Sequence, residues 1–171
     1  TFSRLQNKEG VNEVEGSNKH TYIIRSIETD DARSFINLQE CIFNECDFEY
    51  FQANEQNLTV QQIRKCMAEW RKVKTSNILL CIVNGEFAGY AFIKGNSSSR
   101  TKHVAQLRIG VVEAFQRIGI GSALLTQAEQ WCQSHQIERL EASILAHNEK
   151  AKSLFEKHNY ICEGIRKNSF K

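Results

Sequence analysis

The sequence feature that most constrains the fold is residues 103–125, where a strand pattern gives way within a few positions to a helix pattern. Residues 104–112 are mostly apolar and β-branched, which is typical of a buried strand. Gly119 and Gly121 then stand one residue apart at the predicted start of the helix, where they let the backbone approach a ligand closely. The first N–H groups of a helix have no partners within it. This helix N-terminus is therefore suited to phosphate, and Arg117 adds a charge-assisted contact.

Two common phosphate-binding motifs do not fit this segment. A dinucleotide fingerprint needs a third glycine where the chain has Leu124, and a P-loop needs Gly-Lys-Ser/Thr after four intervening residues. The pattern that is present, Gln116-x-x-Gly119-x-Gly121, resembles the diphosphate loop of the GNAT N-acetyltransferase superfamily. The resemblance covers about residues 22–166 and includes a second segment, residues 146–157, with the pattern Asn-x-x-Ala-x-x-Leu-aromatic.

The resemblance implies an α/β (α+β) GNAT fold, with a mixed central sheet of roughly six to seven strands flanked by roughly four helices. Residues 21–171 would form the acetyltransferase domain, and the polar residues 1–20 an N-terminal extension or linker. The chain would move an acetyl group from acetyl-CoA directly to an amine acceptor, either a small molecule or a protein amino group. A catalytically weak or inactive acetyl-CoA-binding module is the alternative, because Phe155 stands where many relatives have a Tyr that protonates the leaving thiolate.

The resemblance also implies which residues hold acetyl-CoA. Backbone groups of Ile109 and Val111 would pair with the pantetheine arm. An N–H near Val111 or Val112 would meet the thioester oxygen, which makes Val112 a catalytic candidate. Asn148 would hydrogen-bond the cofactor arm or, in a structural role, cap the last helix. The residues expected to bind the cofactor are Ile109, Val111, Gln116, Arg117, Ile118, Gly119, Ile120, Gly121, Ser122, Asn148, Lys152 and Phe155.

Acetyl transfer to an amine also requires a proton acceptor. An amine with a pKa near ~10.4 is mostly charged at neutral pH, so a group of the protein or a water molecule must take its proton. Glu113 directly follows the predicted central strand and is the first candidate, although it also fits a solvent-facing turn. Glu141, His103 and a water held by backbone carbonyls are the other candidates.

Acidic residues gather where relatives bind the acceptor, beside residues 44–57. Glu45, Asp47 and Glu49 would receive a cationic amine there. The other interpretation is a solvated acidic loop over an aromatic anchor, because charged side chains are mostly exposed.

Composition and charge exclude several classes of protein. The chain has 171 residues, 41% of them hydrophobic, which suits one globular core and is too short for two full domains. Its formal net charge of +2 is too small to create a positive field that would attract nucleic acid. No apolar run approaches the roughly 20 residues that span a bilayer. We therefore expect a cytoplasmic protein that binds neither nucleic acid nor membrane.

The six cysteines form no C-x-x-C pair and have no His at ligand spacing, which argues against zinc and against a disulfide framework. Cys66, Cys81 and Cys132 lie in apolar periodic segments, where reduced and mostly buried thiols are expected. We therefore expect no metal site.

Caps, turns and hydrophobic periods predict the remaining elements. They are a strand at 21–27, a helix from Thr29 or Asp30, a helix from Thr59, a hairpin at 77–94 turning at Asn84-Gly85, a strand at 139–146, a helix between Asn148 and Asn159, and a strand at 160–166. The family usually adds one more closing strand, which this pattern lacks at its C-terminal end. Residues 1–6 alternate like such a strand, which is compatible with a tandem precursor, strand exchange in a homodimer or a shortened chain.

Overall fold

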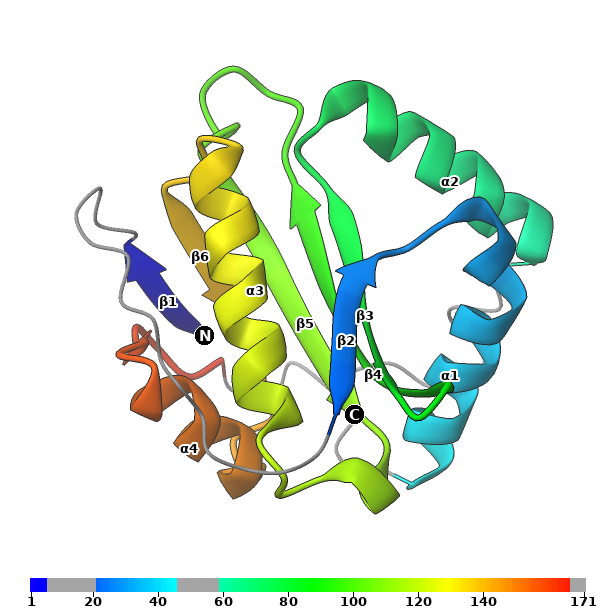
Figure 1. Ribbon diagram of the computed structural model, residues 1–171. Helices are drawn as coiled ribbons and strands as arrows, with labels where there is room; N and C mark the ends of the chain where they lie inside the picture. Colours follow the sequence, from blue (N-terminus) through cyan, green and yellow to red (C-terminus); the bar gives the residue numbers. More distant parts are fainter. Residues whose placement is uncertain (6–20, 46–58, 167–171) are drawn as a thin grey trace.

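The computed structural model describes residues 1–5, 21–45 and 59–166, and Figure 1 shows a twisted sheet with helices on both faces. Its strands are β1 (Phe2–Leu5), β2 (Tyr22–Ser26), β3 (Asn77–Val83), β4 (Glu86–Gly95), β5 (Val104–Val111), β6 (Arg139–Ala142) and β7 (Ile161–Cys162). Its helices are α1 (Ala32–Glu45), α2 (Val60–Val73), α3 (Ile120–Ser134) and α4 (Glu149–Lys157). The sheet order in this part of the chain is β2-β3-β4-β5-β6-β1-β7, with β5 and β6 parallel, which confirms the predicted mixed α/β architecture.

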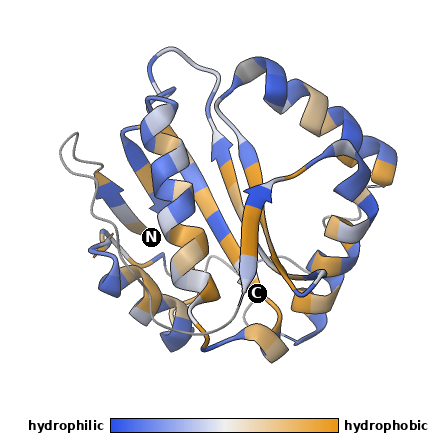
Figure 2. Ribbon diagram, in the orientation of Figure 1, coloured by the Kyte–Doolittle hydropathy of each residue, from blue (hydrophilic) through white to orange (hydrophobic). Residues whose placement is uncertain are grey.

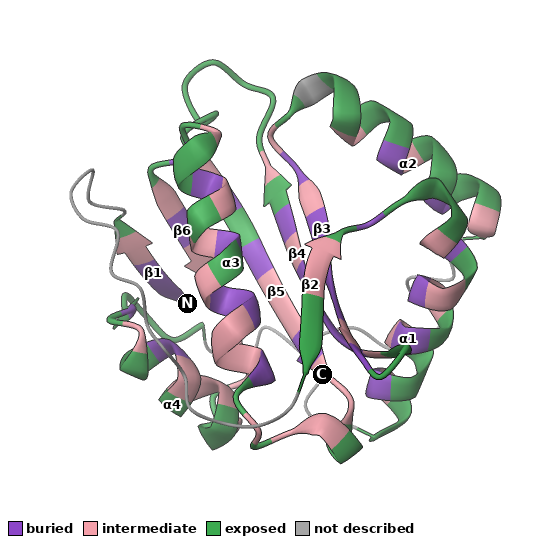
Figure 3. Ribbon diagram, viewed as in Figure 1, coloured by how far each residue is buried: buried purple, intermediate pink, exposed green. Residues whose placement is uncertain are grey.

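Each face of the sheet has its own hydrophobic core, because successive side chains of a strand point to opposite faces. On β4, Ala91 and Ile93 face the core under α3 and α4, whereas Tyr90 and Phe92 face α1 and α2. The outer helix surfaces are mostly hydrophilic in Figure 2 and exposed in Figure 3. Burial on both faces explains why the central strands have nearly continuous apolar sequences.

Cap and turn residues end several elements where the sequence predicts. Thr59 Oγ1 accepts the N–H of Gln62 at 3.3 Å and caps α2. Asn84 and Gly85 have positive φ angles of 49° and 84°, which close the β3–β4 hairpin tightly. Asn159 adopts the expected left-handed conformation after α4, with a φ of 62°.

The first helix starts later than expected. Thr29 and Asp30 belong to a 3-10 turn, Thr29–Asp31, and α1 follows this turn. The Glu28 N–H donates to Asp31 Oδ2 at 2.7 Å, so the capping interaction forms one residue before Thr29. Short polar side chains compete for such positions, and the sequence alone did not decide between them.

The strands expected at 139–146 and 160–166 are shorter in the structure. β6 ends at Ala142, because the following residues leave β5 and border a cavity. β7 contains only Ile161 and Cys162, both exposed. An exposed edge strand of two residues offers few backbone groups for unwanted pairing.

β1 lies inside the sheet, between β6 and β7 and antiparallel to both. Phe2 is buried there, although the sequence pattern assigned residues 1–20 to an extension or linker. Arg4 Nη1 donates to the two carboxylate oxygens of Glu129 at 2.9 and 3.0 Å and to the carbonyl of His158 at 2.9 Å. The N-terminal segment therefore forms a strand of this sheet, as the alternation of residues 1–6 indicates, and is tied to both α3 and the end of α4.

Replacing Phe2 with Ala should lower the free energy of unfolding by about 3 kcal/mol, since it leaves a cavity beside Phe155. The Phe2 side chain is 4% exposed, and its ring centroid lies 6.1 Å from that of Phe155. Leu5→Ala is the matched control in the same strand: Leu5 is 68% exposed, and its loss should change stability by less than about 0.5 kcal/mol. Urea unfolding measures both. Equally small changes would mean that β1 is not held in the sheet.

Candidate active site

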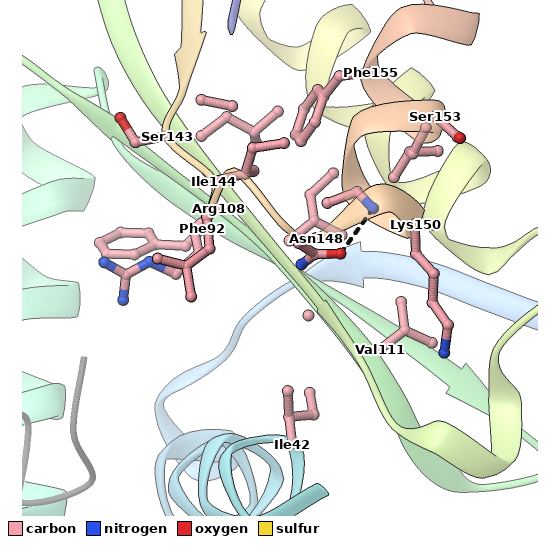
Figure 4. A pocket seen from close by; sticks show the side chains of 18 of the residues that line it. Ile42, Phe92, Arg108, Val111, Ser143, Ile144, Asn148, Lys150, Ser153 and Phe155 are labelled. Carbon is pink, nitrogen blue, oxygen red and sulfur yellow. Dashed lines mark hydrogen bonds between the residues drawn. The ribbon is translucent and has the colours of Figure 1, made fainter. Parts of the chain in front are cut away.

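A cavity of about 800 Å³ opens where β5 and β6 part. The parallel pairing of these strands ends at Leu107 and Ala142, whereas β5 continues to Val111. The cavity is also lined by the loop after β5, the first turn of α3, α4 and the C-terminal part of α1. Figure 4 shows side chains from these separate parts of the chain around one space. Its volume lies within the range of small-molecule sites.

The backbone of β5 supplies polar groups to this cavity. The Val112 N–H donates to the carbonyl of Ala88 at 2.9 Å, on the β4 side. Residues in an antiparallel ladder alternate between directing both backbone groups toward the partner strand and directing both away. Ile109 and Val111 therefore direct their groups away from β4, toward the side where β6 has departed. The Val112 N–H, predicted as a catalytic donor, is therefore already bonded to β4, which makes Val111 the better candidate for that role.

Gln116 connects the end of β5 to α4. Its Nε2 donates to the carbonyl of Val111 at 3.0 Å, and Lys150 Nζ donates to its Oε1 at 3.2 Å. The Val111 carbonyl therefore already has a partner, so the N–H is the Val111 backbone group to consider for a ligand. The motif glutamine holds the strand end in place.

The loop after β5 brings the N-terminus of a long helix to the cavity. Arg117 and Gly119 have positive φ angles of 64° and 90°, and Gly119 is the N-cap of α3. The first backbone bond of α3 runs from the Ala123 N–H to Gly119 at 3.0 Å. The N–H groups of residues 120–122 therefore have no partner within the helix and point toward its N-terminal end. This arrangement suits an anion, as the glycine spacing predicts.

The predicted loop residues divide into two groups. Those that line the cavity are Gln116, Arg117, Gly119, Gly121 and Ser122. Ile118 and Ile120 instead pack against the core beneath α3, so only their backbone groups remain for a ligand. The sequence did not separate the two groups, because core contacts of a loop depend on distant elements.

Asn148 and Phe155 both lie on the cavity, as Figure 4 shows. Asn148 Oδ1 accepts the Ala151 N–H at 3.0 Å, so this side chain caps α4. The buried ring of Phe155 stacks on Phe2 and meets Tyr160 edge-on, with centroids 5.1 Å apart. Phe155 thus gives the cavity an apolar wall without a hydroxyl group.

The structure does not place Lys152 among the residues that line the cavity. Lys150, for which the sequence favoured a solvated face, does line it. Residues two positions apart on a helix lie on nearly opposite faces, so a small error in the predicted helix orientation exchanges them.

Acidic residues of the cavity are partly engaged by the protein itself. Glu45 Oε2 accepts the Glu113 N–H at 2.7 Å, which ties the end of α1 to the 3-10 turn after β5. Glu141 lines the cavity and pairs with Arg139 at 2.7 Å. His103 precedes the opposite end of β5 and is not among the lining residues. Glu113 is exposed and lines the cavity.

Asp47 and Glu49 lie outside the described residues. The lining residues that were not predicted include Phe92, Lys94 and Arg108. Phe92 pairs with Arg108 across β4 and β5, on the face opposite Ile109. The alternation of β4 and β5 is the signal that could have identified them.

Cysteine thiols of the described residues fit the expectation of reduced side chains. Cys81 and Cys132 are buried, and burial raises the pKa of the Cys81 thiol to about 11. Cys41 and Cys162 are exposed. In residues 1–5, 21–45 and 59–166, no cluster of three or more potential ligands could hold a metal ion. No helix within the same ranges is long and apolar enough to cross a membrane.

Solved structures of acetyltransferases align with most of the chain. An acetyltransferase of the GNAT family from Streptococcus pneumoniae is 26% identical, with a TM-score of 0.82, and the match covers 88% of this chain and 91% of that protein. A GNAT superfamily phosphinothricin acetyltransferase from Sinorhizobium meliloti, in complex with acetyl-CoA, is 17% identical, with a TM-score of 0.74 and coverage of 88% and 81%.

Sequence comparison agrees with the structural comparison. The L-amino acid N-acetyltransferase AaaT of Escherichia coli (strain K12) is 26% identical over 90 residues, which span 52% of this chain and 56% of that protein. The model of the Acetyltransferase (GNAT) family matches residues 34–160, from α1 to the end of α4 and beyond. That match includes the glycine loop, strands β5 and β6, and α4. The chain therefore belongs to the GNAT acetyltransferase family.

Proposed function

We propose that this chain transfers an acetyl group from acetyl-CoA directly to an amine acceptor. The observation that carries the proposal is that one cavity contains both an anion-binding helix N-terminus and the backbone edge of β5 beyond β6. A diphosphate joined to an extended amide-rich arm matches these two features. The acceptor then enters from the side of α1.

The chain's own groups divide the binding of acetyl-CoA between them. The N–H groups of residues 120–122 would hold the diphosphate, with Arg117 and Lys150 supplying positive charge. The backbone edge of Ile109 and Val111 would pair with the pantetheine amides. Asn148 and Phe155, which both line the cavity, would complete the wall around the pantetheine arm.

The chemical step needs charge stabilisation more than a special side chain. The amine nitrogen attacks the thioester carbon, and the carbonyl oxygen takes up negative charge that the Val111 N–H would stabilise. A well-placed donor of this kind removes roughly 3 kcal/mol from a barrier. The C–S bond then breaks and CoA leaves as a thiolate, whose ordinary pKa near ~8.5 makes it a fair leaving group without an acid.

Glu113 is the proposed acceptor of the amine proton, directly or through water. Its backbone is held by Glu45, so the turn that carries it has a defined position beside the cavity. Glu45 then acts as a positioning residue and, with Asp47 and Glu49, contributes negative charge near a cationic acceptor. Small-molecule amines and protein amino groups both fit this chemistry, and the name of the E. coli relative adds L-amino acids to the acceptors to be screened.

The second candidate function is acetyl-CoA binding without catalysis, which Phe155 favours because it supplies no acid to the leaving thiolate. Release of the CoA thiol, measured across a panel of polyamines, amino acids and peptides, distinguishes the two. Acceptor-dependent release supports transfer. Binding of acetyl-CoA with no acceptor-dependent release would leave only the second candidate.

Replacing Gly121 with Glu should weaken acetyl-CoA binding by at least about 100-fold, because it places a carboxylate beside the diphosphate site. Gly121→Gln is the matched control with a neutral side chain of the same length. A Cβ at this position would lie 3.4 Å from Leu154, an ordinary contact, so the glutamine variant should fold and lose much less affinity. Calorimetric titration with acetyl-CoA measures both. Equal affinities would rule out the diphosphate assignment.

Glu113→Gln should lower kcat by roughly 100-fold if Glu113 accepts the proton, and the rate should then rise with pH as more of the amine is already neutral. Glu86→Gln, an exposed acid in the β3–β4 hairpin, is the control and should behave as wild type. The measurement is kcat from pH 6 to 9. If the pH profile of kcat for Glu113→Gln matched that of wild type, Glu113 would have only a structural role in the turn.

Phe155→Tyr should retain or increase kcat, because the added hydroxyl would point along a wall that faces the proposed thioester. Steady-state rates at saturating acetyl-CoA test this. If kcat fell by more than about tenfold, the position proposed for α4 relative to the reacting atoms would be wrong.

A further inference from the structure

His158 contacts the cavity wall through Ser122, although it does not line the cavity itself. Its Nε2 lies 3.1 Å from Ser122 Oγ, which belongs to the first turn of α3 and lines the cavity. His158 is the C-cap residue of α4 and is half-buried. The proposed transfer reaction uses neither the imidazole nor its contact with α3.

Arg4 fixes the end of α4 on which His158 stands. Its Nη1 donates to the His158 carbonyl at 2.9 Å and, at the same time, to the carboxylate of Glu129 on α3 at 2.9 and 3.0 Å. The Arg4–Glu129 pair is partly buried. The position of the imidazole relative to Ser122 is therefore determined by β1, α3 and α4 together.

The surroundings of His158 favour the neutral imidazole. Burial lowers the pKa of His158, and the positive charges of Arg4 on β1 and Lys157 on α4 lower it further; Glu129 on α3 faces Arg4. A neutral imidazole carries one N–H, so its tautomer decides whether Nε2 donates to the serine hydroxyl or accepts from it.

A hydroxyl group has one proton and two lone pairs. If Nε2 accepted that proton, Ser122 would offer only lone pairs to an anion at the helix N-terminus. If Nε2–H donates, the Oγ lone pair is used internally and the hydroxyl proton is left for the ligand. An anion in the cavity therefore favours the donating tautomer.

We propose that His158 is a positioning residue of the acetyl-CoA site: its Nε2–H donates to Ser122 Oγ, so that the Ser122 hydroxyl donates to a phosphate oxygen of acetyl-CoA. This role rests on the proposed binding of acetyl-CoA. It concerns affinity for the diphosphate and leaves the chemistry at the thioester unchanged.

A double-mutant cycle tests the coupling between the two residues. Ser122→Ala, His158→Phe and the double variant are titrated calorimetrically with acetyl-CoA and with acetyl-pantetheine, which lacks the diphosphate. Each single change should weaken acetyl-CoA binding about tenfold, the double variant should lose no more than either, and acetyl-pantetheine affinity should stay within about twofold. His158→Gln, whose amide N–H can donate from a similar position, should recover most of the affinity.

Where the variants do lose affinity, three patterns would still overturn the role of His158. In the first, the losses of acetyl-CoA affinity in the two single variants multiply in the double variant. In the second, the variants lose as much affinity for acetyl-pantetheine as for acetyl-CoA. In the third, His158→Gln recovers no affinity although its melting temperature equals that of wild type. If wild type binds acetyl-CoA while all variants bind it equally well, only the role of His158 falls. If wild type does not bind acetyl-CoA at all, the proposed function falls together with it.

Discussion

The parting of β5 from β6 is the constraint on which the rest of the site depends. Up to Leu107 and Ala142 the two strands satisfy each other's backbone groups, and beyond that point the groups of Ile109 and Val111 lose this partner. Buried backbone groups without partners are unfavourable, so the opening must be solvated or filled by a ligand. An extended arm with its own amides can restore the lost pairing, which explains why a backbone edge rather than a set of side chains defines this site.

Keeping the strands apart requires that each be anchored on its other side. β5 is held by its long pairing with β4, and its end is fixed by the Gln116 side chain on the Val111 carbonyl. β6 is held by β1, whose four residues all pair with it. Without β1, the short β6 would be an edge strand next to an open cavity. The N-terminal strand therefore supports the cavity wall, and Phe2 supports Phe155 from behind.

Features determined by local chemistry could be predicted from the sequence. The Asn84-Gly85 turn, the Thr59 cap and the glycine loop before α3 each depend on a few adjacent residues whose backbone preferences are strong. The sequence could not narrow the proposed oxyanion donor to one residue, because a shift of one position in a strand exchanges the two directions of its backbone groups. The observed Val112–Ala88 bond engages the Val112 N–H and therefore favours Val111 as the proposed donor. The location of β1 depends on pairing with segments more than 130 residues away, and the sequence carries no local sign of that partner.

For the barrier to acetyl transfer, the absence of a hydroxyl group on Phe155 should matter less than the protonation of the acceptor amine. An amine with a pKa near ~10.4 is neutral at pH 7 in only about one molecule in 2,500, which corresponds to about 4.6 kcal/mol. That is more than the roughly 3 kcal/mol that one backbone donor supplies to the oxyanion. For a peptide α-amino group, with a pKa near ~7.7–8.0, the free-energy cost of deprotonation at pH 7 is only about 1 kcal/mol. The pKa of the acceptor therefore decides how strongly the transfer depends on a general base such as the proposed Glu113, whereas Phe155 would affect only a thiolate that leaves readily.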